Sequence, residues 1–421
     1  MYSRRTEGIK EALEILLENP LIVLCTNCDL GTFGMPLNFD IEPLLLELKK
    51  LRYQLHAAAE ISGEEHQTAE IITDFLLATN PDELQTNIGG HGITATYDSK
   101  EAGPHLLIRC ELDGLPISDQ IKAVYQSKTE GIGHKCGHDG HMAIVGGMAK
   151  LLGNKRPKAG KVTLLFQPAE ETGEGAQRVI KDSKFKDLAP DYYFALHNLP
   201  GFPKHQVVAK NDTFAAASVG LIIRFDGATA HAAHPEEGNS PALAVAQTIQ
   251  SFSAVPQFQV PLEQSAKVTV IHAVLGERAF GTSPGQGTVM ATLRTYDDDL
   301  LAKLKDHCIQ IAKGHADTYN LGLDIEWVEE FPATVNNDKA VQIIESAAGQ
   351  VGSEIHHKKE PFSWSEDFGH FTKDHKGAMF GLGAGENHPA LHAQTYDFPD
   401  EIIVTGISMF MQIINEAIDR S

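Results

Sequence analysis

The sequence predicts an α/β protein whose catalytic domain has a mainly parallel sheet covered by helices and is interrupted by an inserted α+β, ferredoxin-like domain. Apolar strands alternate with amphipathic helices along much of the 421 residues, which is typical of a parallel sheet with helices on both faces. Between residues 216 and 330 the order changes to strand–helix–strand–strand–helix–strand, the order of a ferredoxin-like unit.

The length of the chain favours more than one domain, because a single hydrophobic core rarely extends over so many residues. The change of pattern supplies the boundaries. We expect an N-terminal extension at 1–35, a first part of the catalytic domain at 36–215, an inserted lid or dimerisation domain at 216–330, and a second part of the catalytic domain at 331–421.

The individual elements follow from hydrophobic periodicity. In the first part, helical apolar stripes occupy 41–61 and 63–79, and short apolar runs predict strands at 105–110, 161–167 and 191–197. The predicted inserted domain has strands at 218–227, 266–274, 287–296 and 323–331, with helices at 240–255 and 297–316. In the second part we expect a helix at 338–352, a strand at 376–385 and a final helix at 401–419.

Composition and charge exclude several classes of function. Lys and Arg total 35 and Asp and Glu total 56, so the net charge is −21. This balance argues against binding to nucleic acid or to anionic membranes, although a local pocket can still bind an anionic small molecule. No apolar run approaches the roughly 18–20 residues of a membrane span, and the N-terminus has no secretory pattern. We therefore expect a cytoplasmic protein.

The five cysteines do not suggest a disulfide framework, since they are few and odd in number. Cys25 and Cys28 have CxxC spacing, but a second pair for a four-cysteine zinc site is missing and turn-forming residues follow them. We interpret this pair as structural or incidental.

Potential metal ligands follow nearly every predicted strand of the catalytic domain. The segments are ELDGLP at 111–116, GHKCGHDGH at 133–141, PAEE at 168–171, LHN at 196–198 and ENHPALHAQ at 386–394. In α/β sheets, the loops beyond the carboxyl ends of the strands form the ligand-binding crevice. Thiolate, imidazole and carboxylate groups there predict a site for zinc-type ions.

Two adjacent carboxylates within this set, Glu170 and Glu171, suggest a division of labour. One can bind a metal ion, while the other takes a proton from a water molecule that the metal has made more acidic. The residues alone leave open which glutamate has which role.

The chain resembles metal-dependent amidohydrolases and carboxypeptidases of the M20 peptidase group, in the branch of aminoacylases, hippurate hydrolases and auxin-conjugate hydrolases. The similar segments run from about residue 40 to 421 and include LLIRCELDGLP, GHKCGHDGHMAIVGGMAKLL, VTLLFQPAEETGEGAQRVI, GATAHAAHPEEGNSPALA, WSEDFG and HPALHAQTYDF. The resemblance implies hydrolysis of the amide bond of N-acyl amino acids or short peptides by a metal-activated water molecule.

The resemblance also implies a role for individual residues. Two divalent ions (Zn, Mn, Co or Ni) would be bound by Cys136, His138, Glu171, His197 and His392. Glu170 would be the general base, and His231 would polarise the scissile carbonyl, often from the partner subunit of a homodimer formed through the inserted domain. Asp113 and Asp139 would support the ligands, while Arg294 and Asn198 would contact the substrate.

Two stretches depart from the pattern of that family. Gly281–Pro284 replaces an Asn-Val-Ile-Pro stretch near the proposed carboxylate-binding Arg294, and Trp364 stands where a small residue is common. Both departures concern substrate specificity.

Two other classes of function remain as alternatives. Cys136 with His138 is a candidate nucleophile–base pair of a cysteine hydrolase, although such partners usually lie far apart in sequence. A non-catalytic binding module on the same fold is the second alternative, and an intact Glu170 argues against it.

Overall fold

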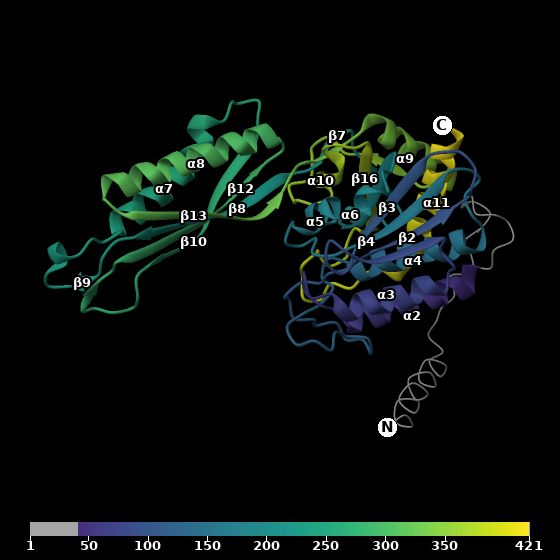
Figure 1. Ribbon diagram of the computed structural model, residues 1–421, viewed down its shortest axis with the longest axis horizontal. Coiled ribbons are helices and arrows are strands. Elements are labelled where there is room, and N and C mark those ends of the chain that lie inside the picture. Colours follow the sequence, from purple (N-terminus) through teal and green to yellow (C-terminus); the bar gives the residue numbers. More distant parts are fainter. Residues whose placement is uncertain (1–40, 421) are drawn as a thin grey trace, which may run out of the picture.

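A computed structural model describes residues 41–420, and the expected extension at 1–35 and the Cys25–Cys28 pair lie outside them. The described chain forms two bodies (Figure 1). One contains the larger sheet with the first and last helices, and the other is an elongated domain that projects from it.

The larger body is built on an eight-stranded sheet with the order β1-β2-β4-β3-β5-β16-β6-β15. Its four central strands are parallel: β4 (Lys161–Gln167), β3 (His105–Glu111), β5 (Tyr192–Pro200) and β16 (Gly377–Gly385). The flanking strands are β1 (Glu83–Ile88), β2 (Gly92–Asp98), β6 (Val207–Ala209) and β15 (Ile355–His357), and antiparallel pairs join β1 to β2, β2 to β4 and β6 to β16. The predicted α/β class is confirmed, with mixed pairing toward the edges.

Helices cover both faces of this sheet. One face packs against α2 (Ile41–Ala57), α3 (His66–Leu77), α4 (His138–Asn154), α9 (Asp338–Val351) and α11 (Ile403–Asp419). The other face packs against the shorter α5 (Gly175–Lys181), α6 (Ser183–Lys186) and α10 (Gly369–Thr372). Helix α4 packs closely against α11 because a glycine lies at their contact: a side chain at Gly147 would meet Ile407 at 2.4 Å.

From the sequence we expect no apolar run as long as a membrane span, but the C-terminal helix region contains one. Asp400–Asp419, comprising the short 3-10 helix η3 (Asp400–Ile402) and α11, is long and apolar enough to cross a membrane by length and composition. Most of this segment is buried inside the molecule, where α11 packs against α9 and α4. The apolar side chains of this segment therefore form part of the hydrophobic core.

The projecting body contains the expected strand–helix–strand–strand–helix–strand order. Its elements are β8 (Ala217–Asp226), α7 (Ala242–Gln259), β10 (Ala266–Leu275), β12 (Gln286–Thr295), α8 (Asp298–Thr318) and β13 (Gly322–Phe331). The strands form an antiparallel sheet in the order β10-β12-β8-β13. Alternate residues such as Val289, Ala291 and Leu293 are buried under the two helices, which leaves the opposite face of the sheet without a helical cover.

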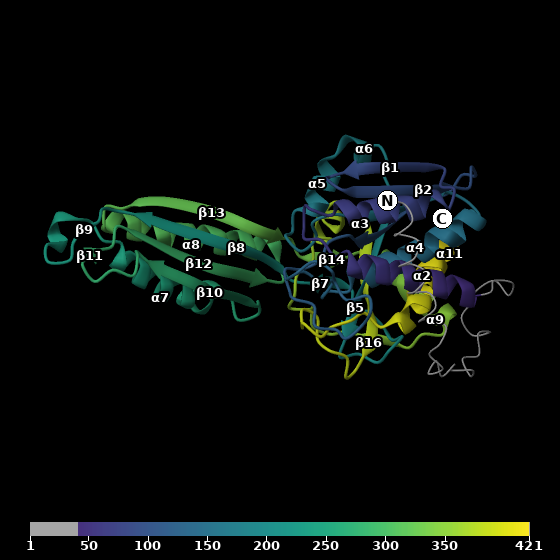
Figure 2. The same cartoon turned by 90° about the horizontal axis from the view of Figure 1, so that it is seen from below.

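The two ends of the projecting domain have different structures. Where the chain enters and leaves, β7 (Asp212–Ala215) pairs with β14 (Thr334–Asn336), so both connections are held in one small sheet. At the opposite tip, β9 (Ala230–His231) pairs with β11 (Thr282–Ser283), and the 3-10 helix η2 (Pro235–Glu237) follows β9. Figure 2 shows this tip as the part of the domain farthest from the larger sheet.

Candidate metal centre

Cys136 and His138 reach the carboxyl edge of the parallel strands from the start of helix α4. Gly137 lies between them with φ of +97°, a conformation that glycine adopts without steric cost. A side chain there would also meet the amide of Asn198 at 2.5 Å. Glycine therefore lets the chain turn so that the cysteine and the histidine point to the same place.

The two glutamates come from the turn that follows β4. Ala169 has φ of +51°, and the next residues, Glu170 and Glu171, leave the strand at the edge shared with β3 and β5. The backbone N–H of Glu171 donates to Oδ2 of Asp113 at 3.0 Å, which fixes the turn against the loop after β3. The pair is thereby placed beside His138, whose Nε2 lies 3.9 Å from Glu170 Oε2 and 3.8 Å from Glu171 Oε1.

The two remaining histidines come from strand β5 and from the loop after β16. His197 is in β5, and its Nε2 lies 3.3 Å from Cys136 Sγ while its Nδ1 faces the backbone oxygen of Asn198 at 2.8 Å. His392 is in the loop after β16, where its backbone N–H donates to the oxygen of Lys135 at 2.8 Å.

The five side chains expected as ligands come together in overlapping groups. Within each group, the ligand atoms lie within 4.8 Å of one another. Cys136 belongs to one group with His138 and His197 and to a second with Glu171 and His392, while His138 and both glutamates form a third. Two groups that share a cysteine suit two neighbouring ions with the thiolate between them.

Unsatisfied buried atoms support this interpretation. His138 Nε2 and Glu171 Oε1 are buried and make no hydrogen bond within residues 41–420, although they face each other at 3.8 Å. Buried polar atoms are normally hydrogen-bonded, so such a pair requires an explanation. Zinc lies about 2.0–2.2 Å from nitrogen and oxygen ligands, so a separation of this size leaves room for an ion between them. The donor set fits a divalent metal.

The pKa values of these groups show how the buried carboxylates act on one another and on the neighbouring side chains. Burial opposes the charged form of His138, but Glu111, Asp113 and Glu171 raise its pKa to about 10. Burial raises the pKa of Glu171 to about 7, and burial with the nearby carboxylates raises that of the Cys136 thiol well above its usual value. A cation among the donors would stabilise the thiolate and carboxylates that now resist ionisation.

The residues expected to support the ligands have distinct positions. Asp113 lies behind His138, with its backbone oxygen 2.9 Å and its Oδ1 3.4 Å from His138 Nδ1. A partner at Nδ1 leaves Nε2 to face the donor group, as in many metal-binding histidines. Asp139 points the other way: its Oδ2 contacts His56 Nδ1 at 2.8 Å and Arg52 at 3.0 Å, which anchors the start of α4 to α2.

Asn198 is placed differently from the expectation of a substrate contact. Its side chain is fully buried, and its Nδ2 donates to the backbone oxygen of Cys136 at 2.7 Å. Its Oδ1 accepts from the Tyr396 hydroxyl. Since both ends of the amide are engaged inside the protein, the geometry assigns Asn198 to holding the Cys136 backbone in place.

A buried charge network behind the glutamates was not predicted from the sequence. Arg109 of β3 forms ion pairs with Glu111, with Glu366 at 2.7 Å and with Asp367 at 2.6 Å. Asp367 also donates its backbone N–H to Glu170 Oε1 at 3.4 Å, so the network reaches the expected general base. The sequence signal was an arginine inside the apolar strand HLLIRCE, because a buried arginine requires carboxylate partners.

His141 is a second buried residue near the centre to which the sequence analysis gave no direct role. Its Nδ1 lies 2.7 Å from Glu111 Oε2, and its Nε2 accepts from the backbone N–H of Asn198 at 3.2 Å. It joins Glu111 and His138 in a further cluster of potential ligand atoms. Its position four residues after Gly137, one turn into α4, could have indicated an inward-facing side chain.

His231 does not approach this centre within the same chain. It is exposed in β9 at the distal tip of the projecting domain, as Figures 1 and 2 show. The expected substrate-handling stretch Gly281–Pro284 lies beside it, since Thr282 pairs with His231.

Arg294 lies at the opposite end of that domain, where its Nη1 donates to Ser363 O at 2.6 Å and to Ser365 Oγ at 2.7 Å. The ten residues of β12, about 33 Å of strand, separate the two ends, so Gly281–Pro284 and Arg294 of the same chain do not share one substrate contact.

The chain is similar to known hydrolases over most of its length. Residues 107–416 match the sequence profile of Peptidase family M20/M25/M40. The chain is 29% identical over 371 residues to a hippurate hydrolase of Campylobacter jejuni, which covers 87% of this chain and 95% of that one. It is also 29% identical over 358 residues to an N-acetyl-L-cysteine deacetylase of Bacillus subtilis, which covers 84% of each chain.

The fold is shared with a solved structure. A crystal structure from Bacillus subtilis, described as a dinuclear metal binding peptidase from the M20 family, superposes with a TM-score of 0.76. The match covers 91% of this chain and all of that one, at 24% sequence identity.

Proposed function

Since this chain belongs to peptidase family M20/M25/M40 and is a hydrolase of amide bonds, we propose that it cleaves N-acyl amino acids or short peptides with the help of two divalent ions. The observation that carries the proposal is the convergence of the five donors, which come from four separate segments of the chain, into groups that share Cys136. The names of the relatives favour an acyl group on an amino acid as the substrate.

The ligands in this proposal are Cys136, His138, Glu171, His197 and His392. Divalent ions bound there would make a water molecule acidic enough to attack at neutral pH and would polarise the scissile carbonyl. Thiolate, imidazole and carboxylate donors suit Zn, Mn, Co and Ni, and we propose these as the candidate ions.

Glu170 is the proposed proton carrier. Its carboxylate is buried beside His138, and burial together with Glu366 and Glu171 raises its pKa well above the usual value. A base with a raised pKa accepts a proton from the attacking water and then donates it to the nitrogen of the leaving amine. The backbone N–H of Asp367 points at Oε1 of this side chain and helps to hold it in position.

The role of His231 requires a second copy of the chain. Its exposed position at the tip of the projecting domain suits a histidine that enters the centre of a partner and stabilises the negative oxygen of the tetrahedral intermediate. The edge strand β10 supports dimerisation, because Ile271, Val274 and Leu275 are exposed large apolar residues on a strand whose outer edge has no partner strand within residues 41–420. We therefore propose a homodimer formed through the inserted domain.

The catalytic proposal is tested by comparing two glutamates of the same turn. The variant Glu170→Gln should lower kcat for N-acetyl and N-benzoyl amino acids by about 10²–10⁴-fold. The matched control Glu174→Gln changes an exposed carboxylate that pairs with Arg178, and it should keep wild-type activity. Full activity in Glu170→Gln would contradict the proposal.

A chelator distinguishes the metal-dependent reaction from a cysteine hydrolase. The proposed enzyme should lose activity to chelation and regain it when Mn, Co or Zn is added. A cysteine hydrolase would survive the chelator and be inactivated by a thiol alkylator. The raised pKa of Cys136 argues against that rival, because the thiolate is the nucleophilic form.

The dimer proposal has a direct complementation test. Glu170→Gln and His231→Ala should each be inactive alone, whereas a mixture that exchanges subunits should regain activity. In a mixed dimer, one centre combines an intact Glu170 with the intact His231 of the other subunit. A monomeric protein in sedimentation, or a mixture without activity, would contradict the role of His231 across the dimer.

A further inference from the structure

Two cations lie side by side on the open face of the inserted sheet. Lys267 of β10 is directly opposite Arg294 of β12 in the antiparallel register, so their Cβ atoms are about 4.5–5.5 Å apart. The face is the one without helices, because the neighbouring Ala266 and Val268 pack into the core under α7 and α8. Like charges in directly opposite positions destabilise a sheet unless something compensates them.

Neither cation is neutralised by a carboxylate within residues 41–420. The hydrogen bonds of Arg294 go to a backbone carbonyl and a hydroxyl, Ser363 O and Ser365 Oγ, and Lys267 takes part in no ion pair. Among the carboxylates on the same face, Asp324 and Glu326 are already bonded to Arg224 at 2.8 and 2.6 Å, and Asp226 accepts from Gln286. Arg224 is six residues along β8 from the partner of Arg294, about 20 Å away.

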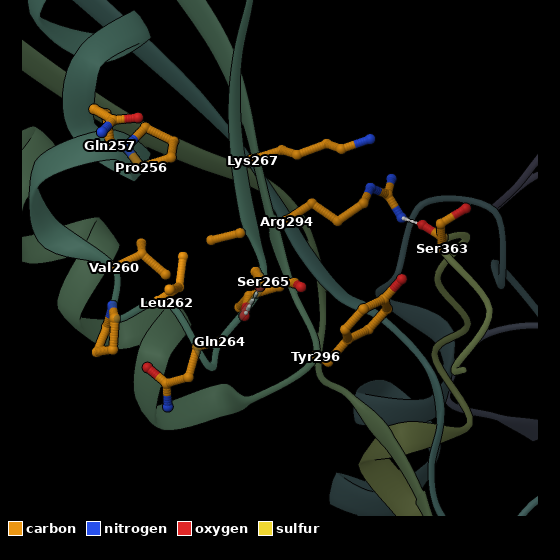
Figure 3. Close-up of a pocket in the computed structure, with 13 residues that line it drawn as sticks. Pro256, Gln257, Val260, Leu262, Gln264, Ser265, Lys267, Arg294, Tyr296 and Ser363 are labelled. Carbon is orange, nitrogen blue, oxygen red and sulfur yellow. Dashed lines mark hydrogen bonds between the residues drawn. The ribbon is translucent and has the colours of Figure 1, made fainter. Parts of the chain in front are cut away.

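Both side chains line one cavity of about 540 Å³ at the base of the projecting domain. Figure 3 shows Lys267 and Arg294 extending from adjacent strands toward the same side, with Arg294 reaching Ser363. The other polar groups in the lining are neutral and include Gln257, Gln264 and Tyr296, and no aspartate or glutamate is present. In a chain with a net charge of −21, a cavity that has two cations and no anion is suited to bind an anionic ligand.

The cavity borders the candidate metal centre through one short segment. Arg294 holds the backbone of Ser363 and the hydroxyl of Ser365, and the residue between them is Trp364. The ring of Trp364 lies 5.4 Å from the ring of His197, one of the proposed ligands. A molecule whose anionic group binds at the two cations can therefore extend along Trp364 toward the centre.

We propose that Lys267 and Arg294 together bind the two carboxylates of a dicarboxylic amino-acid end of the substrate. The inference rests on the proposed function and specifies the class of substrate: N-acyl derivatives of glutamate or aspartate. Arg294 binds the α-carboxylate, the role that the family resemblance already implies. The new assignment is Lys267, which binds the side-chain carboxylate because it stands directly opposite Arg294 in the sheet and extends to the same side.

The test compares a charged substrate with its neutral isostere. The wild-type enzyme should hydrolyse N-acetylglutamate with a kcat/KM at least about 10-fold above that for N-acetylglutamine, since a hydrogen bond between charged groups contributes about a 10- to 100-fold preference. Lys267→Met should remove most of this preference, chiefly through a higher KM for N-acetylglutamate. The control Lys303→Met replaces an exposed lysine on α8 and should keep the wild-type ratio.

A binding measurement separates this inference from the catalytic proposal. Calorimetry with glutarate should show binding to the wild-type protein that weakens about 10-fold or more in Lys267→Met, whereas butyrate should bind weakly to both. Equal hydrolysis of the two N-acetyl substrates by the wild type, or an unchanged ratio in Lys267→Met, would overturn the inference. If no N-acyl amino acid is hydrolysed with any metal, the proposed function fails, while glutarate binding still decides whether the two cations form a dicarboxylate site.

Discussion

Arg109 offers the sharpest test of how the structure supports the candidate centre. The guanidinium is completely buried and pairs with the carboxylates of Glu111, Glu366 and Asp367, while its Nε donates to Gln167 at 2.9 Å. The substitution Arg109→Met keeps a long apolar side chain in the same space. It removes the only group among residues 41–420 that forms ion pairs with all three carboxylates.

The expected loss of stability follows from the charges that remain. Breaking a buried ion pair by removing one partner typically costs about 3–5 kcal/mol, because the other charge stays buried without compensation. For a domain of this size, such a loss lowers Tm by roughly 6–15 °C. The control Arg178→Met breaks an exposed pair with Glu174 and should cost about 1 kcal/mol or less.

The pH dependence gives a second signature of the same network. Burial opposes ionisation of Glu111, but Arg109 and His141 hold its pKa below the ordinary value of 4.5. A depressed pKa contributes stability that is present above pH 4.5 and is lost as the pH falls. The difference between wild type and Arg109→Met should therefore be largest above about pH 5 and shrink in more acidic solution.

Thermal and urea unfolding with a chelator present would measure these differences without a contribution from bound metal. Arg109→Met with a stability within 1 kcal/mol of the wild type at pH 7.5 would refute the reasoning. A difference that grows as the pH falls would refute the assignment of the charges.

Three other measurements test the packing and the electrostatics of the fold. Gly140→Ala should destabilise the catalytic domain by about 1–3 kcal/mol in urea unfolding, because the new Cβ would meet the ring of Phe398 at 2.2 Å. Gly314→Ala, in an exposed turn of α8 with open space around it, should instead stabilise by about 0.5–1 kcal/mol. Burial opposes the charged form of His56, but Asp139 and Asp119 raise its pKa from 6.5 to about 9, so its contribution of about 3 kcal/mol should be full below pH 6.5 and disappear as the pH rises through 9. Stability that stays constant over this range, relative to His56→Gln, would contradict the pairing. Adding a chelator to metal-loaded protein should lower Tm, and restoring the metal should reverse the change.

Much of the fold could be predicted because local periodicity coincides with tertiary structure in the core. The predicted strand at 161–167 has the bounds of β4, and the predicted strand at 266–274 is one residue shorter than β10. The strands β1 and β2, of six and seven residues, were not predicted. The missed strands β6 and β15 are only three residues long. Such short strands exist because neighbouring strands supply their hydrogen bonds. The hydrophobic pattern of the sequence does not show which strands pair, so it does not predict them.

For the candidate centre, the sequence predicted which residues take part but not how their side chains are oriented. Cys136, His138, Glu171 and His197 have ligand-type side chains at or after successive strands, which is visible in one sequence. The opposite orientations of His138 and the adjacent Asp139 depend on the packing of α4, with His138 facing the donor group and Asp139 facing α2. The sequence could not distinguish them because both occupy the same helical turn.

The sequence by itself determined which chemical groups are present and in what order, and therefore the family and the class of reaction. Only the tertiary structure decided that Asn198 is closed off behind Cys136, that Arg109 ties three carboxylates together, and that His231 and Arg294 lie at opposite ends of one domain. The physical reason is that the hydrogen bonds within a helix and the periodicity of side chains act over a few residues. The meeting of distant segments depends instead on strand order and on which faces pack together.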